Sequence, residues 1–248
     1  MSTSQPAVGR SGLANVVDII IAPNAAFERL RQVPVWGWAF LVASLLGSAG
    51  TLLAIPAVEH AMATSMPAQL AASDAIAKLP PDQQQKQIAT MMSVSTTIAK
   101  FYWVFIPPAI LLAGLIQGLI MLIANAATRG DGSFKKFFAL SVTVAVVGTG
   151  LGSIVVGAIV TLRGASSFET MSSVQSSLPS LALLAPGAKG ALAGFLGSLN
   201  VFYLWATALL AMGMSRVGRI PRGPAWVTAV IMLLLTACFA AYGGKQNG

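Results

Sequence analysis

Five long stretches of this chain carry no charged side chain. They cover residues 36–58, 102–127, 137–162, 191–213 and 224–243, and none contains Asp, Glu, Lys, Arg or His. A helix needs about 20 apolar residues to cross about 30 Å of hydrocarbon. Because lipid offers backbone groups no hydrogen-bond partner, each crossing segment must satisfy its own peptide groups. The sequence therefore predicts an all-α, polytopic membrane bundle with about five transmembrane helices.

The balance of residue types supports a membrane location. Only 9% of the 248 residues are charged and the mean hydropathy is +0.77, whereas about 25% of the residues of a soluble domain are charged. Lys and Arg outnumber Asp and Glu by 15 to 7. Such an excess is typical of the cytoplasmic loops of membrane proteins, and no basic run interleaved with aromatic residues indicates a nucleic-acid surface. The predicted partner is therefore the lipid bilayer, and no nucleic acid.

The basic residues also predict how the chain is oriented. Nine of them lie in residues 1–35 and in the short loops 128–136 and 214–223, and six are spread over the opposite side. Short loops carry the orientation signal, because their Lys and Arg stay in the cytoplasm. Trp36 and Trp226 stand at span ends, where indole rings favour the headgroup level. We expect a cell inner (plasma) membrane protein whose N-terminus is cytoplasmic and whose C-terminus lies outside.

Residues 1–35, the predicted cytoplasmic tail, contain a helical pattern. Pro23 and Asn24 follow a short apolar run, and a brief helix is expected to continue through Phe27 and Leu30, which share one helical face. A short helix with one apolar face fits the cytoplasmic interface of a membrane. The same pattern fits a helix packed on the bundle, and the sequence does not separate the two.

Two longer segments connect spans on the predicted outer side. Segment 59–101 is an expected outer loop in which Asp82 can cap a helix that runs towards the second span. Pro107 and Pro108 are expected to kink that helix or to mark its start. Segment 163–190 is rich in Ser and Leu, and whether part of it re-enters the membrane stays open.

Motifs for catalysis and ligand binding are missing from the sequence. The single histidine, His60, has only Glu59 beside it, whereas a zinc site needs three or four protein ligands. No H-E-x-x-H, G-x-S-x-G or Walker phosphate-binding motif occurs. The single cysteine, Cys238, lies in an apolar run, where a small buried side chain is expected. No residue is predicted to be catalytic, cofactor-binding or metal-binding, and the chain is not expected to be an enzyme.

A few polar and small residues lie inside the spans. Gln117 and Asn200 are expected to hydrogen-bond between helices, and Trp205 is expected to pack against a neighbouring helix. Glycines four residues apart, such as Gly114 and Gly118, are typical of close helix contacts. A pore lined by the polar residues is the alternative, and it would make the chain a channel or permease subunit.

Two short segments stand out as motifs: Pro23-Asn24-Ala25-Ala26-Phe27-Glu28-Arg29-Leu30, and the loop Gly130-Asp131-Gly132-Ser133-Phe134-Lys135. Both resemble segments in the prokaryotic form of the Yip family, named for Ypt-interacting protein. The fourth span and the short basic loop after it resemble the closing segment of the family. These pieces occur in the family's order from about residue 15 to the end. The family-motif positions that the resemblance assigns are Pro23, Phe27, Gly132, Phe134, Lys135, Trp205 and Gly213.

The resemblance implies a five-helix transmembrane domain over residues 36–243 with a cytoplasmic N-terminus. Eukaryotic members of the family are linked to Rab-type small GTPases. That role is not carried over, because the tail lacks their long cytoplasmic region and Ala139-Leu140 stands where Tyr-Pro often follows the loop. The resemblance implies a non-enzymatic membrane protein that organises or binds other membrane components, including copies of itself.

Overall fold

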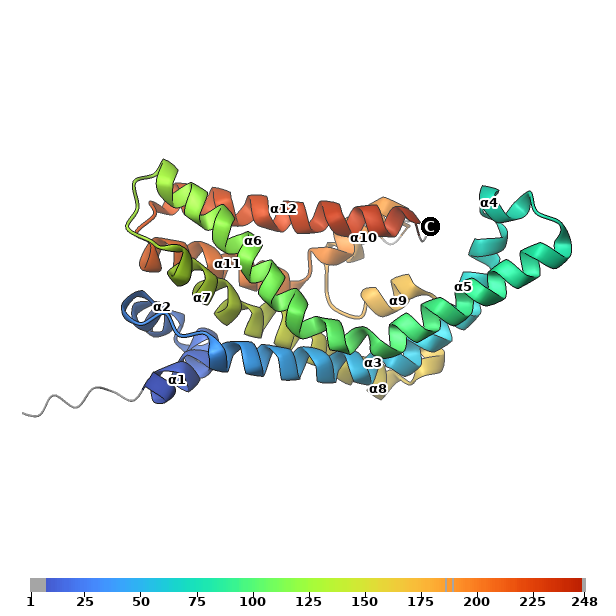
Figure 1. The fold of residues 1–248 in the computed structure, drawn as a ribbon, viewed down its shortest axis with the longest axis horizontal. Coiled ribbons are helices and arrows are strands. Elements are labelled where there is room, and N and C mark those ends of the chain that lie inside the picture. Colours follow the sequence, from blue (N-terminus) through green and yellow to red (C-terminus); the bar gives the residue numbers. More distant parts are fainter. Residues whose placement is uncertain (1–7, 186, 189, 247–248) are drawn as a thin grey trace, which may run out of the picture. The chain divides into compact units, whose positions relative to one another are not determined.

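Helices make up most of the computed structural model, which describes residues 8–185, 187–188 and 190–246 (Figure 1). The α-helices are α1 (Val8–Ile21), α2 (Pro23–Gln32), α3 (Gly37–Ala71), α4 (Asp74–Ala77), α5 (Pro81–Phe101), α6 (Ile106–Ala127), α7 (Phe134–Ala145), α8 (Gly152–Arg163), α9 (Met171–Gln175), α10 (Gly190–Ser198), α11 (Val201–Val217) and α12 (Arg222–Gln246). Shorter 3₁₀ or π turns are η1 (Tyr102–Phe105), η2 (Val146–Leu151), η3 (Ala165–Ser167) and η4 (Leu181–Leu184). The predicted all-α fold class is confirmed.

In the described part of the chain, four helical segments are long and apolar enough to cross a membrane. They are Gly37–Ala71, Pro81–Ala127, Phe134–Arg163 and Arg222–Tyr242. These segments contain the second and third predicted spans, and they contain the first and fifth except for the end residues Trp36 and Gly243. Large apolar side chains are exposed along several of them, as at Leu119 of α6 and Leu235 of α12, which fits helices whose outer faces meet lipid.

The fourth predicted span, 191–213, is divided rather than continuous. α10 ends at Ser198, and α11, with 17 residues, starts at Val201. An extended segment pairs with the break: the Leu181 amide donates to the Leu199 carbonyl at 3.2 Å, and the Val201 amide donates to the Pro179 carbonyl at 3.2 Å. Because these backbone groups find partners in another segment, the helix is interrupted without leaving them unpaired.

The predicted outer loop 59–101 is mostly helical. α3 continues to Ala71 with Pro56 and Pro67 inside it, and α5 continues through η1 into α6. Pro80 precedes α5, and Asp82 lies in its first turn instead of capping it. The tight turn η1 comes just before Pro107 and Pro108, whose rings and missing N–H groups disturb the α-helical bonding of the preceding turn.

Two compact units divide the chain. Unit 1 comprises Met1–Gly47, Ile106–Gly152 and Phe202–Leu235. Unit 2 comprises Ser48–Phe105, Ser153–Val201 and Thr236–Gly248.

The core of unit 1 includes the N-terminal helices. Phe27 and Leu30 of α2 are fully buried and belong to the same apolar cluster as Phe137 of α7 and Met214 of α11. The apolar face of α2 therefore packs against the bundle. Of the two positions left open by the sequence, the structure favours the helix packed on the bundle over the helix in the membrane interface.

Unit 2 is built on close backbone contact. A Cβ built on Gly50 of α3 would lie 2.2 Å from the carbonyl carbon of Ser153, at the start of α8. Ser48 Oγ donates to the Trp103 carbonyl at 3.0 Å, and Lys100 pairs with Glu59 at 3.4 Å. Cys238, expected to be buried, is exposed on α12, next to Phe239, which is exposed as well.

Candidate functional site

The loop between α6 and α7 is shaped by one buried amide. Asn125, 6% exposed, lies near the end of α6. The Gly132 amide donates to Asn125 Oδ1 at 3.0 Å. Asn125 Nδ2 donates to the carbonyls of Gly130 and Gly132, both at 3.3 Å. All the polar atoms of this side chain therefore hold loop 128–133 in one conformation.

The same loop is bound to the turn between α11 and α12. The Asp131 amide donates to the Gly218 carbonyl at 3.0 Å, and the Asp131 carboxylate pairs with Arg219 Nε at 3.2 Å. Arg219 has φ 53°, in the left-handed region that few non-glycine residues occupy. Two chain segments that are far apart in the sequence thus form one surface at an end of unit 1 (Figure 1).

Phe137 fills the space beneath this junction and is fully buried. A Cβ on Gly132 would lie 2.2 Å from Phe137 Cζ, and a Cβ on Gly218 would lie 2.5 Å from the same atom. Both positions must therefore lack a side chain while the ring stays in place. The family-motif position Gly132 has a physical explanation in this contact.

Phe134 packs against neighbouring side chains, whereas Lys135 faces solvent. The Phe134 ring lies 3.1 Å from a Cβ built on Gly118 of α6 and stacks on Phe138, with 6.1 Å between the ring centroids. Gly114, one turn earlier, receives Phe138 in the same way, at 3.0 Å. Lys135 is exposed. Gly114 and Gly118 of α6 therefore leave the space that the rings of Phe138 and Phe134 of α7 occupy.

Polar contacts join the two N-terminal helices, α1 and α2. Arg29 of α2 pairs with Asp18 of α1, and Arg29 Nε donates to Asn15 Oδ1 at 2.8 Å. Pro23 opens α2 at a position where its missing N–H costs nothing. Glu28 faces Arg216 at the end of α11, with 3.9 Å between their charged atoms. These contacts attach α1 and α2 to the same end of unit 1.

We call this region the polar end: α1, α2, loop 128–133, the first turn of α7, and the turn 218–221 with its flanking residues. It carries more positive than negative charge. The basic side chains that the structure describes there are Arg29, Arg31, Arg129, Lys135, Lys136, Arg216, Arg219 and Arg222. Its acidic side chains are Asp18, Glu28 and Asp131. Since the acids are all engaged in ion pairs, the surface presents a basic excess.

The structure gathers some predicted positions and separates others. Pro23, Phe27, Gly132, Phe134 and Lys135 all lie at the polar end. Trp205 and Gly213 lie along α11 instead. A Cβ on Gly213 would lie 2.4 Å from Leu140 Cδ1, and Trp205 packs against the core of unit 1, as expected from the sequence.

The two predicted interhelix residues have different surroundings. Gln117 Oε1 of α6 accepts a hydrogen bond from Ser141 of α7 at 2.6 Å, which is a contact between helices. Asn200 is buried at the break between α10 and α11, where it pairs with Ser180 in an isolated bridge. Sequence reasoning did not single out Asn125, although an amide close to the end of an apolar span was the available signal.

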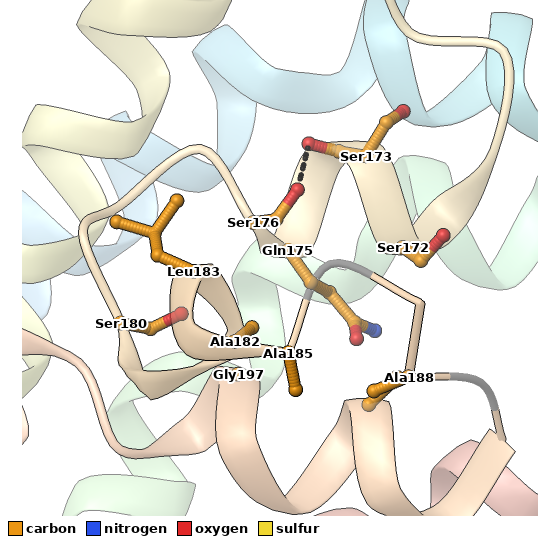
Figure 2. A pocket seen from close by; sticks show the side chains of 11 residues that line it. Ser172, Ser173, Gln175, Ser176, Ser180, Ala182, Leu183, Ala185, Ala188 and Gly197 are labelled. Atoms are coloured by element: carbon orange, nitrogen blue, oxygen red, sulfur yellow. Dashed lines mark hydrogen bonds between the residues drawn. The ribbon is translucent and has the colours of Figure 1, made fainter.

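A second candidate is a hollow in unit 2, with a volume of about 400 Å³, between α9, η4 and α10 (Figure 2). Hydroxyl groups of Ser172, Ser173, Ser176 and Ser180 line it together with Gln175. Ser176 Oγ donates to the Ser173 carbonyl at 3.2 Å, so part of this polarity is used within α9. None of the lining residues that the structure describes is charged, and the hollow offers little to hold an ionic ligand.

Comparisons with known proteins point to one family. The Yip1 domain model matches residues 17–243. The chain is 28% identical over 235 residues to the "Membrane protein YknW" of Bacillus subtilis (strain 168). The aligned region covers 92% of this chain and 89% of the relative. No solved structure matches.

Proposed function

This chain belongs to the Yip1 domain family, and from that premise we propose that it is a non-enzymatic inner-membrane protein that binds another membrane protein or a second copy of itself. The polar end is the proposed binding surface. The observation that carries the proposal is loop 128–133, which Asn125 and Gly218 hold in one conformation. A surface that is ordered before binding loses less conformational entropy when a partner arrives.

The charge of the polar end supports a cytoplasmic location for it. Among the side chains that the structure describes there, eight are basic and three are acidic, and basic residues near span ends are retained in the cytoplasm. We therefore place the N-terminal helices on the cytoplasmic side of the membrane and the C-terminal end of α12 on the outer side. The relative from Bacillus subtilis carries the name of a membrane protein, which agrees with this location and adds nothing on a partner.

Site-specific crosslinking tests the binding surface. A photoreactive amino acid at the exposed position Lys135 should give a discrete adduct in living cells, and the same group at exposed Gln85 of α5 should not. Asp131→Ala should weaken the adduct, because it removes the ion pair with Arg219 that helps to fix the loop. An adduct of twice the chain's mass would identify a second copy as the partner. Equal crosslinking at positions 135 and 85, unchanged by Asp131→Ala, would contradict the proposal.

A channel or permease subunit is the alternative function. Gln117 is its natural candidate for a pore lining, but this side chain accepts a hydrogen bond from Ser141 at 2.6 Å, which supports a packing role. Flux measurements on purified protein in liposomes separate the two. Substrate-dependent flux that Gln117→Leu abolishes would favour the alternative and overturn the non-enzymatic binding function proposed here.

A further inference from the structure

Helix α1 has an apolar stripe that faces away from unit 1. Leu13, Val17 and Ile21 follow one another at intervals of four residues and are 49%, 51% and 73% exposed. Residues four apart lie on one face of a helix. The other face is apolar too, because Val16 and Ile19 are buried in the core of unit 1. The three exposed side chains are therefore not needed to pack α1 against the rest of unit 1.

Contacts of α1 place it where the first span begins. A Cβ on Gly12 would lie 2.9 Å from Trp38 Cδ1, so the helix rests on the indole ring. Trp36 and Trp38 stand at the start of α3, and tryptophans at span ends favour the headgroup level of a membrane. α1 thus lies beside the level at which α3 enters the bilayer.

The polar residues of α1 fix which way the stripe points. Asn15 and Asp18 both bind Arg29 of α2, so rotation of α1 about its axis would break two polar contacts. Leu13 and Val17 consequently stay on the outer side.

The polar end, to which α1 belongs, also carries exposed basic side chains. Arg31, Lys135 and Arg219 belong to the polar end, where positive charge is in excess. Basic residues close to a membrane surface attract anionic phospholipids, at about 1 kcal/mol for each Lys or Arg. An apolar stripe beside a basic surface is the combination that interfacial helices use.

We propose that α1 lies in the plane of the membrane, with Leu13, Val17 and Ile21 in the headgroup–acyl boundary of an anionic leaflet. The occupant of the stripe is lipid, not a protein. The helix with Phe27 and Leu30, for which the sequence left the interface and the bundle open, instead buries these two side chains in the core of unit 1.

Depth-dependent quenching tests this assignment on the full chain. Val17→Cys in a Cys238→Ala background carries an environment-sensitive fluorophore, in vesicles of phosphatidylcholine and phosphatidylglycerol brominated near the top of the acyl chains. An interfacial helix is buried about 5–10 Å below the surface, so the brominated lipid should quench the label at position 17 more strongly than the label on the control. Ser133→Cys, exposed in loop 128–133, is the control and should respond to aqueous iodide instead.

Two results would overturn the proposal. A label at position 17 that iodide quenches and brominated lipid does not would show that the stripe faces water. A label quenched by neither would show that a protein covers it. Ile21→Cys repeats the measurement on the same stripe, so a folding defect in one variant does not decide the outcome.

Discussion

Asn125 and Gly132 exchange hydrogen bonds in both directions: the Gly132 amide donates to Asn125 Oδ1 at 3.0 Å, and Asn125 Nδ2 donates to the Gly132 carbonyl at 3.3 Å. A further bond from Nδ2 reaches the Gly130 carbonyl at 3.3 Å. One side chain of α6 therefore adds to the backbone bonds of loop 128–133, such as the bond from the Gly130 amide to the Asn125 carbonyl at 2.9 Å. The geometry of the proposed binding surface depends on this amide.

Asn125→Ala should loosen the polar end. It leaves the Gly132 amide and two carbonyls without their partner, and such a loss costs about 1–3 kcal/mol in the free energy of unfolding. Proteolysis within loop 128–133 should become faster, and thermal unfolding in detergent should begin earlier. Asn24→Ala, at an exposed position of α2, is the control and should stay within about 0.5 kcal/mol of the natural chain. Equal stability of both variants would contradict the assigned role of Asn125.

Gly50→Ala should separate α3 from α8. The new Cβ would lie 2.2 Å from the Ser153 carbonyl carbon, and because that atom belongs to the backbone, a rotamer change cannot relieve the clash. Overpacking of this kind costs about 1–3 kcal/mol. Gly37→Ala in the same helix meets no atom within 4 Å and should be neutral or stabilising by up to about 1 kcal/mol. Free energies of unfolding in mixed micelles compare the two variants, and equal values would argue against the close contact.

Arg29 and Asp18 should show energetic coupling. Their side chains are 31% and 24% exposed, so solvent screens the pair only in part. A double-mutant cycle with Arg29→Gln and Asp18→Asn should give a coupling of about 1 kcal/mol, at the upper end for exposed ion pairs. The coupling should fall in high salt because dissolved ions screen such charges. Additive effects of the two substitutions would mean that the ion pair between Arg29 and Asp18 does not contribute to stability.

Ser141→Ala should have only a small effect. It removes the 2.6 Å hydrogen bond to Gln117 between α7 and α6, and such bonds in membrane bundles average about 0.6 kcal/mol. Gly213→Ala should cost more, because its Cβ would lie 2.4 Å from the buried Leu140 side chain. Ranking the two variants by thermal midpoint tests whether this bundle depends more on small residues than on buried polar pairs.

Four of the five predicted spans follow from hydropathy alone, because an uncharged stretch longer than the membrane has few other structures open to it. The break at Leu199 and Asn200 was not predictable in this way. It depends on pairing with Pro179 and Leu181, and hydropathy carries no information about such distant partners.

In the candidate site too, residues in a short contiguous motif could be predicted and residues that depend on distant contacts could not. Gly132 and Phe134 were visible through a family resemblance, since they lie in a short contiguous motif. Asn125 and Gly218 were not, because their importance arises only when loop 128–133 meets the turn after α11. The burial of Phe27 was likewise open from the sequence, as an apolar helical face fits a membrane interface and a protein core equally well.

In the proposed topology the polar end of unit 1 faces the cytoplasm. Cysteine accessibility tests it most directly, with Ser133→Cys and Gln85→Cys placed singly in a Cys238→Ala background, since both positions are exposed. In intact spheroplasts, a membrane-impermeant maleimide should label position 85 and leave position 133 unlabelled until the membrane is permeabilised. Labelling of position 133 in intact spheroplasts, with position 85 protected, would contradict this topology.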